Sequence, residues 1–200
     1  MLKQNEKSKS LQMKIGQLLS FIPLSPNQWT LISLLLAFIG AYEIITGQLV
    51  YGLALFALSG IIDMVDGAVA RARGETTKFG GFLDGVCDRL VEALFLISLM
   101  FYPLPYVWMD PKIWLAMLIF IGTCMPAYIR AYAAYNGVIS VEKARAMGGL
   151  FERSERIILL FAGMLAGIFV SMDYFIYAVI AAIVLSAITV MQRIIVVMRG

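Results

Sequence analysis

The sequence predicts an all-α integral membrane protein with six transmembrane helices preceded by an N-terminal interfacial amphipathic helix. The first observation is composition: the 200 residues are 61% hydrophobic and only 14% charged, whereas soluble domains are about a quarter charged. The second is that apolar stretches of roughly 20 residues, the length that crosses a bilayer, recur along the chain. We therefore expect residues 1–200 to form a single transmembrane domain.

The first expected element is the interfacial helix at residues 10–22, where Leu11, Ile15 and Leu18 recur at helical spacing. This segment is too short to span a bilayer, so it should lie on the membrane surface. Pro26 then opens the first spanning helix, because proline is favoured in a first turn. The six spanning helices are expected at residues 27–45, 49–71, 80–101, 112–132, 156–170 and 174–198.

Helix-breaking or charged residues separate these spans. Gly47 follows the first span, and glycine commonly ends a helix. Residues 103–111 contain three prolines and separate the third span from the fourth. Residues 133–155, which are rich in charge, separate the fourth span from the fifth. The loop between the second and third spans is short, so these two spans should be antiparallel neighbours.

The basic residues fall almost entirely on one predicted side of the membrane. With both termini in the cytoplasm, 15 of the 16 lysines and arginines lie on the cytoplasmic half, and only Lys112 lies on the other. Cytoplasmic loops carry this excess in membrane proteins. We therefore expect a multi-pass protein of the cell membrane with both termini in the cytoplasm.

The chain contains no histidine. This absence excludes a histidine triad, a histidine metal ligand and a histidine general base. The two cysteines, Cys87 and Cys124, lie in predicted membrane helices and are interpreted as small apolar packing residues. A structural disulfide or zinc site is therefore not expected.

Four aspartates lie where the second span ends and the third begins. Asp63 and Asp66 are three residues apart, and Asp84 and Asp88 are four apart, so each pair shares one helical face. The short loop between the helices lets the two acidic faces converge. One aspartate at the centre of a membrane helix costs about 2.5–3.5 kcal/mol, so four converging carboxylates require compensation.

Hard divalent cations would provide that compensation, because they bind oxygen ligands. An aspartate-only set favours magnesium or manganese over zinc or copper, and four carboxylates suit two ions. The alternative from another class is a cation transporter, since membrane aspartates also build ion pathways. A transport path needs acidic groups at several depths, whereas these four lie at one end of two helices.

The residues from Asp63 to Asp88 also form a recognisable motif. They match the signature D-x2-D-G-x2-A-R-x8-G-x3-D-x3-D at every fixed position. The chain therefore resembles the CDP-alcohol phosphotransferase family. The resemblance extends to the six helices and the interfacial helix, and implies a magnesium-dependent or manganese-dependent enzyme of phospholipid biosynthesis. Such an enzyme transfers a phosphatidyl or archaetidyl group from a CDP-linked lipid to a polar alcohol and releases CMP.

The resemblance implies roles for individual residues at a cytoplasmic active site. Asp63, Asp66 and Asp84 would bind one metal ion, and Asp88 would replace Asp66 at the second ion. Asp88 would also be the general base that accepts the proton of the acceptor hydroxyl. The residues expected to bind the CDP moiety are Asn27, Thr30, Gly67, Arg71 and Thr77.

A further resemblance concerns the acceptor. The segment at residues 151–156, Phe-Glu-Arg-Ser-Glu-Arg, is similar to the branch of the family that makes phosphatidylinositol phosphate or archaetidylinositol phosphate from inositol 1-phosphate. That branch has a second basic residue where this chain has Tyr132, so glycerol 3-phosphate, serine or a CDP-inositol donor remain alternatives. A homodimer in membrane lipid is implied, with no nucleic acid partner. The residues expected to bind the acceptor phosphate are Arg130, Arg153, Arg156 and Arg193.

Overall fold

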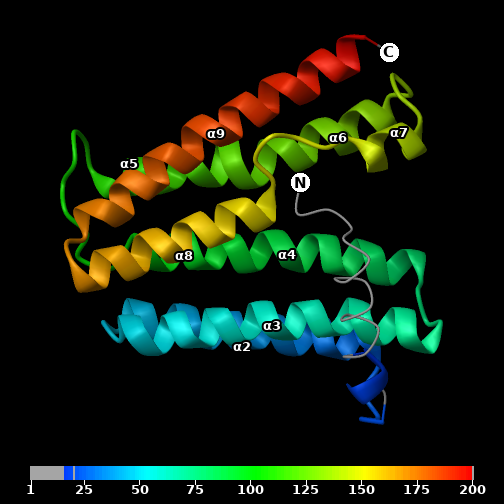
Figure 1. Cartoon of the computed structure of the whole chain (residues 1–200), viewed down its shortest axis with the longest axis horizontal. Coiled ribbons are helices and arrows are strands. Elements are labelled where there is room, and N and C mark those ends of the chain that lie inside the picture. The colour runs from blue at the N-terminus through cyan, green and yellow to red at the C-terminus, as the bar shows by residue number, and fades with distance from the viewer. Residues whose placement is uncertain (1–15, 20, 200) are drawn as a thin grey trace. The chain divides into compact units, whose positions relative to one another are not determined.

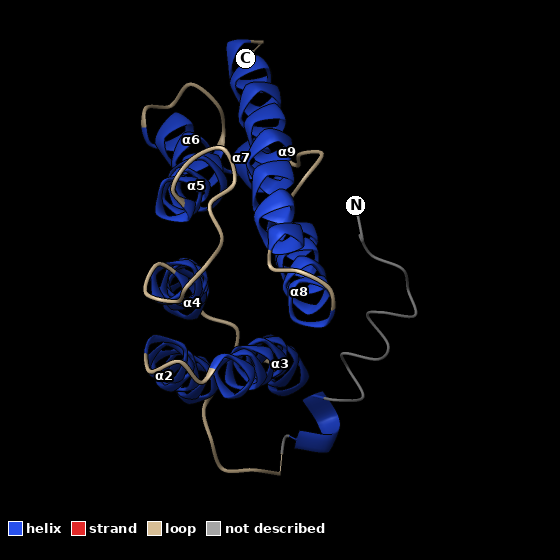
Figure 2. Cartoon of the chain, turned by 90° about the vertical axis from the view of Figure 1, so that its left-hand side faces the viewer, coloured by secondary structure: helices blue, strands red, loops and turns tan. Residues whose placement is uncertain are grey.

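The computed structural model describes residues 16–19 and 21–199, and every regular element among them is helical (Figure 2). The all-α prediction is therefore confirmed. The chain divides into two compact units, Met1–Tyr102 and Pro103–Gly200, and each is described by itself. The prediction of one domain over residues 1–200 stays a prediction.

The first unit contains three long helices, and α2 packs against both of the others (Figure 1). A capping box starts α2: the Ser25 hydroxyl accepts from the backbone N–H of Gln28, and the Gln28 side chain accepts from the backbone N–H of Ser25. Gly74 ends α3 in the left-handed conformation, with φ of 69°. The three helices are α2 (Pro26–Ile45), α3 (Leu49–Arg73) and α4 (Lys78–Leu99).

Small residues let α2 and α3 approach closely. A Cβ atom on Gly52 would lie 2.7 Å from the carbonyl oxygen of Gly40. Nearby, the Ser59 hydroxyl donates to the carbonyl oxygen of Ser33 at 2.8 Å. Interfaces between membrane helices are enriched in such small and hydroxyl-bearing residues.

In the second unit, α9 packs against the helices on either side of a π-helical segment and against α8. Neither the π-helix nor the short α7 was expected from the sequence. Both are local: the π-helix interrupts one continuous predicted span, and α7 has six residues. The elements are α5 (Pro111–Leu118), η1 (Ile119–Cys124), α6 (Met125–Tyr135), α7 (Val141–Ala146), α8 (Arg153–Phe169) and α9 (Asp173–Met198).

Four of the six predicted spans are long and apolar enough to cross a membrane in the described part of the chain: α2, α3, Pro111–Tyr135 and α9. The third predicted span, α4, is a helix but carries five charged residues. The fifth, α8, is a helix of 17 residues with three charges near its start. That α4 and α8 also cross the membrane stays a prediction.

The predicted interfacial helix at residues 10–22 lies largely outside the described residues. Within it, residues 16–19 are helical, and residues 21–22 form a turn. Gly16 is buried, while Gln17 and Leu18 are exposed. An amphipathic helix over the whole segment stays a prediction.

Candidate functional site

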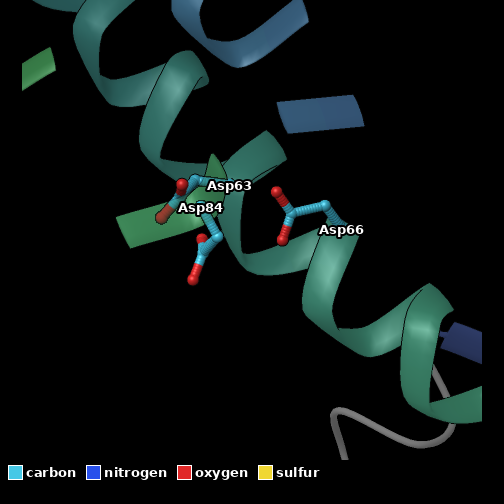
Figure 3. Close-up of side chains that lie close together, drawn as sticks. All are labelled: Asp63, Asp66 and Asp84. Atoms are coloured by element: carbon cyan, nitrogen blue, oxygen red, sulfur yellow. The ribbon is translucent and has the colours of Figure 1, made fainter. Parts of the chain in front are cut away.

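Three of the four predicted aspartates converge in the first unit. One carboxylate oxygen each from Asp63, Asp66 and Asp84 lies within 4.8 Å of the other two (Figure 3). The first two come from α3 and the third from α4, as the spacing along the helices predicted. Asp66 is buried, and the other two are half-buried.

This cluster fits a divalent cation. Two negative charges within 4.8 Å of each other repel by about 3 kcal/mol or more at the effective dielectric constant of a protein surface. A bound cation would convert this repulsion into attraction. The donor atoms are all carboxylate oxygens, which magnesium and manganese prefer.

A hydroxyl group from α2 orients the buried carboxylate. Thr30 Oγ1 lies 2.5 Å from Asp66 Oδ2 and 3.2 Å from the carbonyl oxygen of Pro26. A hydroxyl has one proton to donate, and the shorter, charge-assisted bond is the stronger one. Thr30 therefore donates to Asp66, and this bond restrains the orientation of the Asp66 carboxylate. Thr30 is 4% exposed and Asp66 is 5% exposed.

We expect Thr30→Val to weaken Mn²⁺ binding about tenfold or more, because partners that orient a metal ligand typically contribute that much affinity. Thr30→Ser keeps the hydroxyl and should retain most of the affinity. Titration of the purified variants with Mn²⁺, followed by electron paramagnetic resonance, measures this directly. Equal affinity in Thr30→Val and the wild type would contradict the orienting role.

Asp88 lies one helical turn beyond Asp84 on α4, and it is not part of the three-carboxylate cluster. Its Oδ2 accepts a hydrogen bond from Nη1 of Arg89 at 3.0 Å. The side chain of Asp88 is 14% exposed. Sequence reasoning missed Arg89, although a basic residue directly after the last signature aspartate was the available signal.

A pocket of about 200 Å³ adjoins the cluster. All five residues predicted to bind CDP line it, together with Asp66 and Asp84. Glu75 and Thr76 also line it and were missed, because they lie among the eight unspecified positions of the signature. The remaining lining residues are Pro26, Ala70, Gly80 and Gly81.

Two glycines leave room for polar side chains in this pocket. A Cβ atom on Gly67 would lie 3.1 Å from Nη1 of Arg71, so the guanidinium group lies over this glycine. A Cβ atom on Gly80 would lie 3.0 Å from the Thr77 hydroxyl and 3.2 Å from Oδ1 of Asn27. Thr77 also caps α4, accepting a hydrogen bond from the Gly80 backbone N–H at 2.9 Å. The pocket thus combines a guanidinium group with a helix N-terminus, both of which favour phosphate.

The four predicted acceptor-binding arginines lie in the second unit. Arg193 is buried, and its Nη1 donates to the carbonyl oxygen of Pro126, which links α9 to α6. Arg130 lies one turn along α6 from that proline and is half-buried. Arg156 is buried, and its Cδ lies 3.3 Å from the position of a Cβ on Gly122. Arg153 is half-buried at the start of α8. That these arginines share a site with the aspartates stays a prediction.

Comparison with known proteins gives a family and close relatives. The family model described as CDP-alcohol phosphatidyltransferase matches residues 23–198. The archaetidylinositol phosphate synthase of Pyrococcus horikoshii is 35% identical over 184 residues, which cover 90% of this chain and 87% of that protein.

Two solved structures of the Mycobacterium tuberculosis phosphatidylinositol phosphate synthase are also similar, each at 26% identity. The structure with CDP-DAG bound has a TM-score of 0.77 and covers 94% of both chains. The structure in complex with manganese and citrate has a TM-score of 0.75 and covers 94% of this chain and 88% of that one.

Proposed function

The chain belongs to the CDP-alcohol phosphatidyltransferase family, and from this premise we propose that it transfers a phosphatidyl or archaetidyl group from a CDP-lipid to inositol 1-phosphate. Membership makes the chain an enzyme of phospholipid synthesis, a transferase of substituted phosphate groups, and decides against the cation transporter. The observation that carries the proposal is the convergence of Asp63, Asp66 and Asp84 beside a pocket containing Arg71.

The proposed metal is Mg²⁺ or Mn²⁺, as two ions. Asp63, Asp66 and Asp84 would hold one ion, and Asp63, Asp84 and Asp88 the other. The cations, when bound, neutralise the diphosphate and the charge that develops on the CMP leaving group. The manganese in the mycobacterial structure supports this choice.

The proposed reaction breaks one P–O bond and forms another. The acceptor hydroxyl attacks the phosphorus on the lipid side of the diphosphate, and the bond from that phosphorus to the CMP oxygen breaks. CMP leaves with the bonding electron pair, and a phosphodiester joins lipid and acceptor. Asp88 takes the hydroxyl proton as general base. The Arg89 guanidinium at 3.0 Å holds the Asp88 carboxylate in place for this role.

The proposed CDP site is the pocket beside the carboxylates. Arg71 is the cation for the diphosphate oxygens, and Gly67 leaves the space that its guanidinium occupies. Asn27 and Thr77 meet beside Gly80 and offer neutral hydrogen-bonding groups to the nucleoside. Thr30 contributes to the same wall through its bond to Asp66.

The proposed acceptor carries a phosphate, because six of the nine arginines lie in the second unit and the similar enzymes are named for inositol phosphate products. Arg130, Arg153, Arg156 and Arg193 are the residues proposed to bind this phosphate. Purified protein should be incubated with CDP-lipid and a panel of inositol 1-phosphate, glycerol 3-phosphate and serine. Fastest CMP release with inositol 1-phosphate is the expected result, and faster release with either other alcohol would refute this acceptor.

We expect Arg130→Ala to raise the KM for inositol 1-phosphate about tenfold, since a charge-assisted hydrogen bond contributes roughly 1.5–3 kcal/mol. Arg193→Lys tests the second residue and keeps a donor for the Pro126 carbonyl oxygen. The KM for CDP-lipid should stay near the wild-type value, because that substrate is assigned to the first unit. Unchanged acceptor KM in Arg130→Ala and in Arg193→Ala would remove these residues from the acceptor site.

The remaining proposals concern the setting of the enzyme. Both termini and the active site are proposed to face the cytoplasm, on the basis of the lysine and arginine distribution. Six spans in the cell membrane would add α4 and α8 to the four apolar spans already described. A homodimer is proposed from the family resemblance, and chemical crosslinking in native membranes would test it.

A further inference from the structure

Arg73, the last residue of α3, holds a segment that is distant in sequence. Its Nη1 donates to the carbonyl oxygen of Leu24 at 2.8 Å, and its Nη2 donates to that of Ile22 at 2.6 Å. Its side chain is only 19% exposed, and Oε2 of Glu75 lies 3.9 Å from Nη1. A basic residue that served only to mark the cytoplasmic side would need no such partners.

A second contact ties the same segment to α3. A Cβ atom on Gly16 would lie 2.3 Å from the carbonyl oxygen of Ala68, closer than real Cβ contacts allow. The backbone at Gly16 therefore packs directly on α3 beside Gly67 of the signature. Only glycine fits there without a shift, because the obstructing atom is itself backbone.

The segment held by these contacts leads directly into one wall of the pocket. The chain passes from Leu24 through the Ser25 cap to Pro26, Asn27 and Thr30, which all line the pocket. Thr30 donates to Asp66, so a shift at the start of α2 would reach a predicted metal ligand. The Arg73 bonds therefore restrain the start of α2 relative to α3, and the Gly16 contact restrains residues 16–19 on the same helix.

We propose that Arg73 and Gly16 are positioning residues for the CDP-lipid site, because they hold residues 16–19 and 21–24 against α3 and thereby hold the first turn of α2 against the pocket. This inference rests on the proposed function. The variants that test it are Arg73→Ala, Arg73→Lys and Gly16→Ala. Arg145→Ala and Gly60→Ala are matched controls, since Arg145 is exposed and a Cβ on the exposed Gly60 meets nothing within 4 Å.

We expect Arg73→Ala, which removes two charge-assisted hydrogen bonds, to raise the KM for CDP-lipid about tenfold or more with kcat within about twofold. Gly16→Ala should raise the same KM, because its methyl group would push the segment away from the Ala68 carbonyl oxygen. Arg73→Lys should be intermediate, because an ammonium group lacks the planar fork that spans two carbonyl oxygens. Both controls should keep the wild-type KM. If Arg73→Ala does not fold, Arg73→Lys and Gly16→Ala carry the same comparison.

Hydrogen exchange supplies a readout that needs no catalysis. The backbone amides of Ile22, Leu24, Ser25 and Asn27–Thr30 should exchange faster in the Arg73 and Gly16 variants than in the controls. Wild-type exchange together with unchanged KM would overturn the inference, as would a fall in kcat with unchanged KM. If the wild type releases no CMP from any CDP-alcohol, the proposed function fails. Affinity for CDP itself and amide exchange, measured on the same variants, would then test the positioning roles of Arg73 and Gly16 without catalysis.

Discussion

Asp84→Asn is expected to reduce CMP release more than about a hundredfold, beyond the range seen when a partner that merely orients a metal ligand is lost. Asparagine keeps the size of the side chain but removes one negative charge from a cluster whose oxygens lie within 4.8 Å. Asp63→Asn should have the same effect, because both residues are assigned to both ions. Initial rates of CMP release at saturating Mg²⁺ measure the loss, and Mn²⁺ titration tests whether affinity falls with it.

The matched control for this experiment is Asp110→Asn. Asp110 caps α5 by accepting a hydrogen bond from the Lys112 backbone N–H at 2.8 Å. Asparagine caps helices about as well as aspartate, so this variant should keep wild-type activity. Near-normal turnover of Asp84→Asn, or of the wild type in excess EDTA, would exclude the metal mechanism.

Asp88→Asn is the second variant with a large expected effect. It should abolish transfer because an amide cannot accept the hydroxyl proton as a carboxylate does. CDP-lipid should still bind with measurable affinity, because the three-carboxylate cluster and Arg71 remain. Equilibrium binding of CDP-lipid and single-turnover transfer should be measured on the same preparation.

The comparison between binding and transfer decides what Asp88 does. Loss of transfer with retained binding supports the general base. Loss of both in equal proportion would leave Asp88 as a metal ligand only. Retained transfer would refute both roles. Asp88 would then act only as the partner of Arg89 in the ion pair at 3.0 Å.

Several features of the fold followed from local patterns. The apolar stretches predicted each long helix to within a few residues, as for α2 at residues 26–45 against the expected 27–45. The π-helix could not be predicted in this way, because it differs from an α-helix in hydrogen-bond register and not in apolar content. The short α7 was missed because six residues give no stable periodicity.

The sequence by itself determined the family and the residue types of the site. The signature from Asp63 to Asp88 depends on spacing within two neighbouring helices, and spacing along a helix decides which side chains share a face. Hydropathy likewise depends on composition within about 20 residues. Both properties are local, so neither requires knowledge of the packing.

Only the tertiary structure decided which distant groups support those residues. The Thr30 hydroxyl meets Asp66 across 36 positions of sequence, and the Arg73 guanidinium meets the Ile22 carbonyl across 51. No periodic pattern encodes such pairs, because they depend on how α2 lies against α3 and on where the chain turns before α2. A threonine in an apolar helix and an arginine at a helix end each fit several roles in sequence. Packing selects one role because a buried hydroxyl or guanidinium must find a hydrogen-bond partner where the fold offers one.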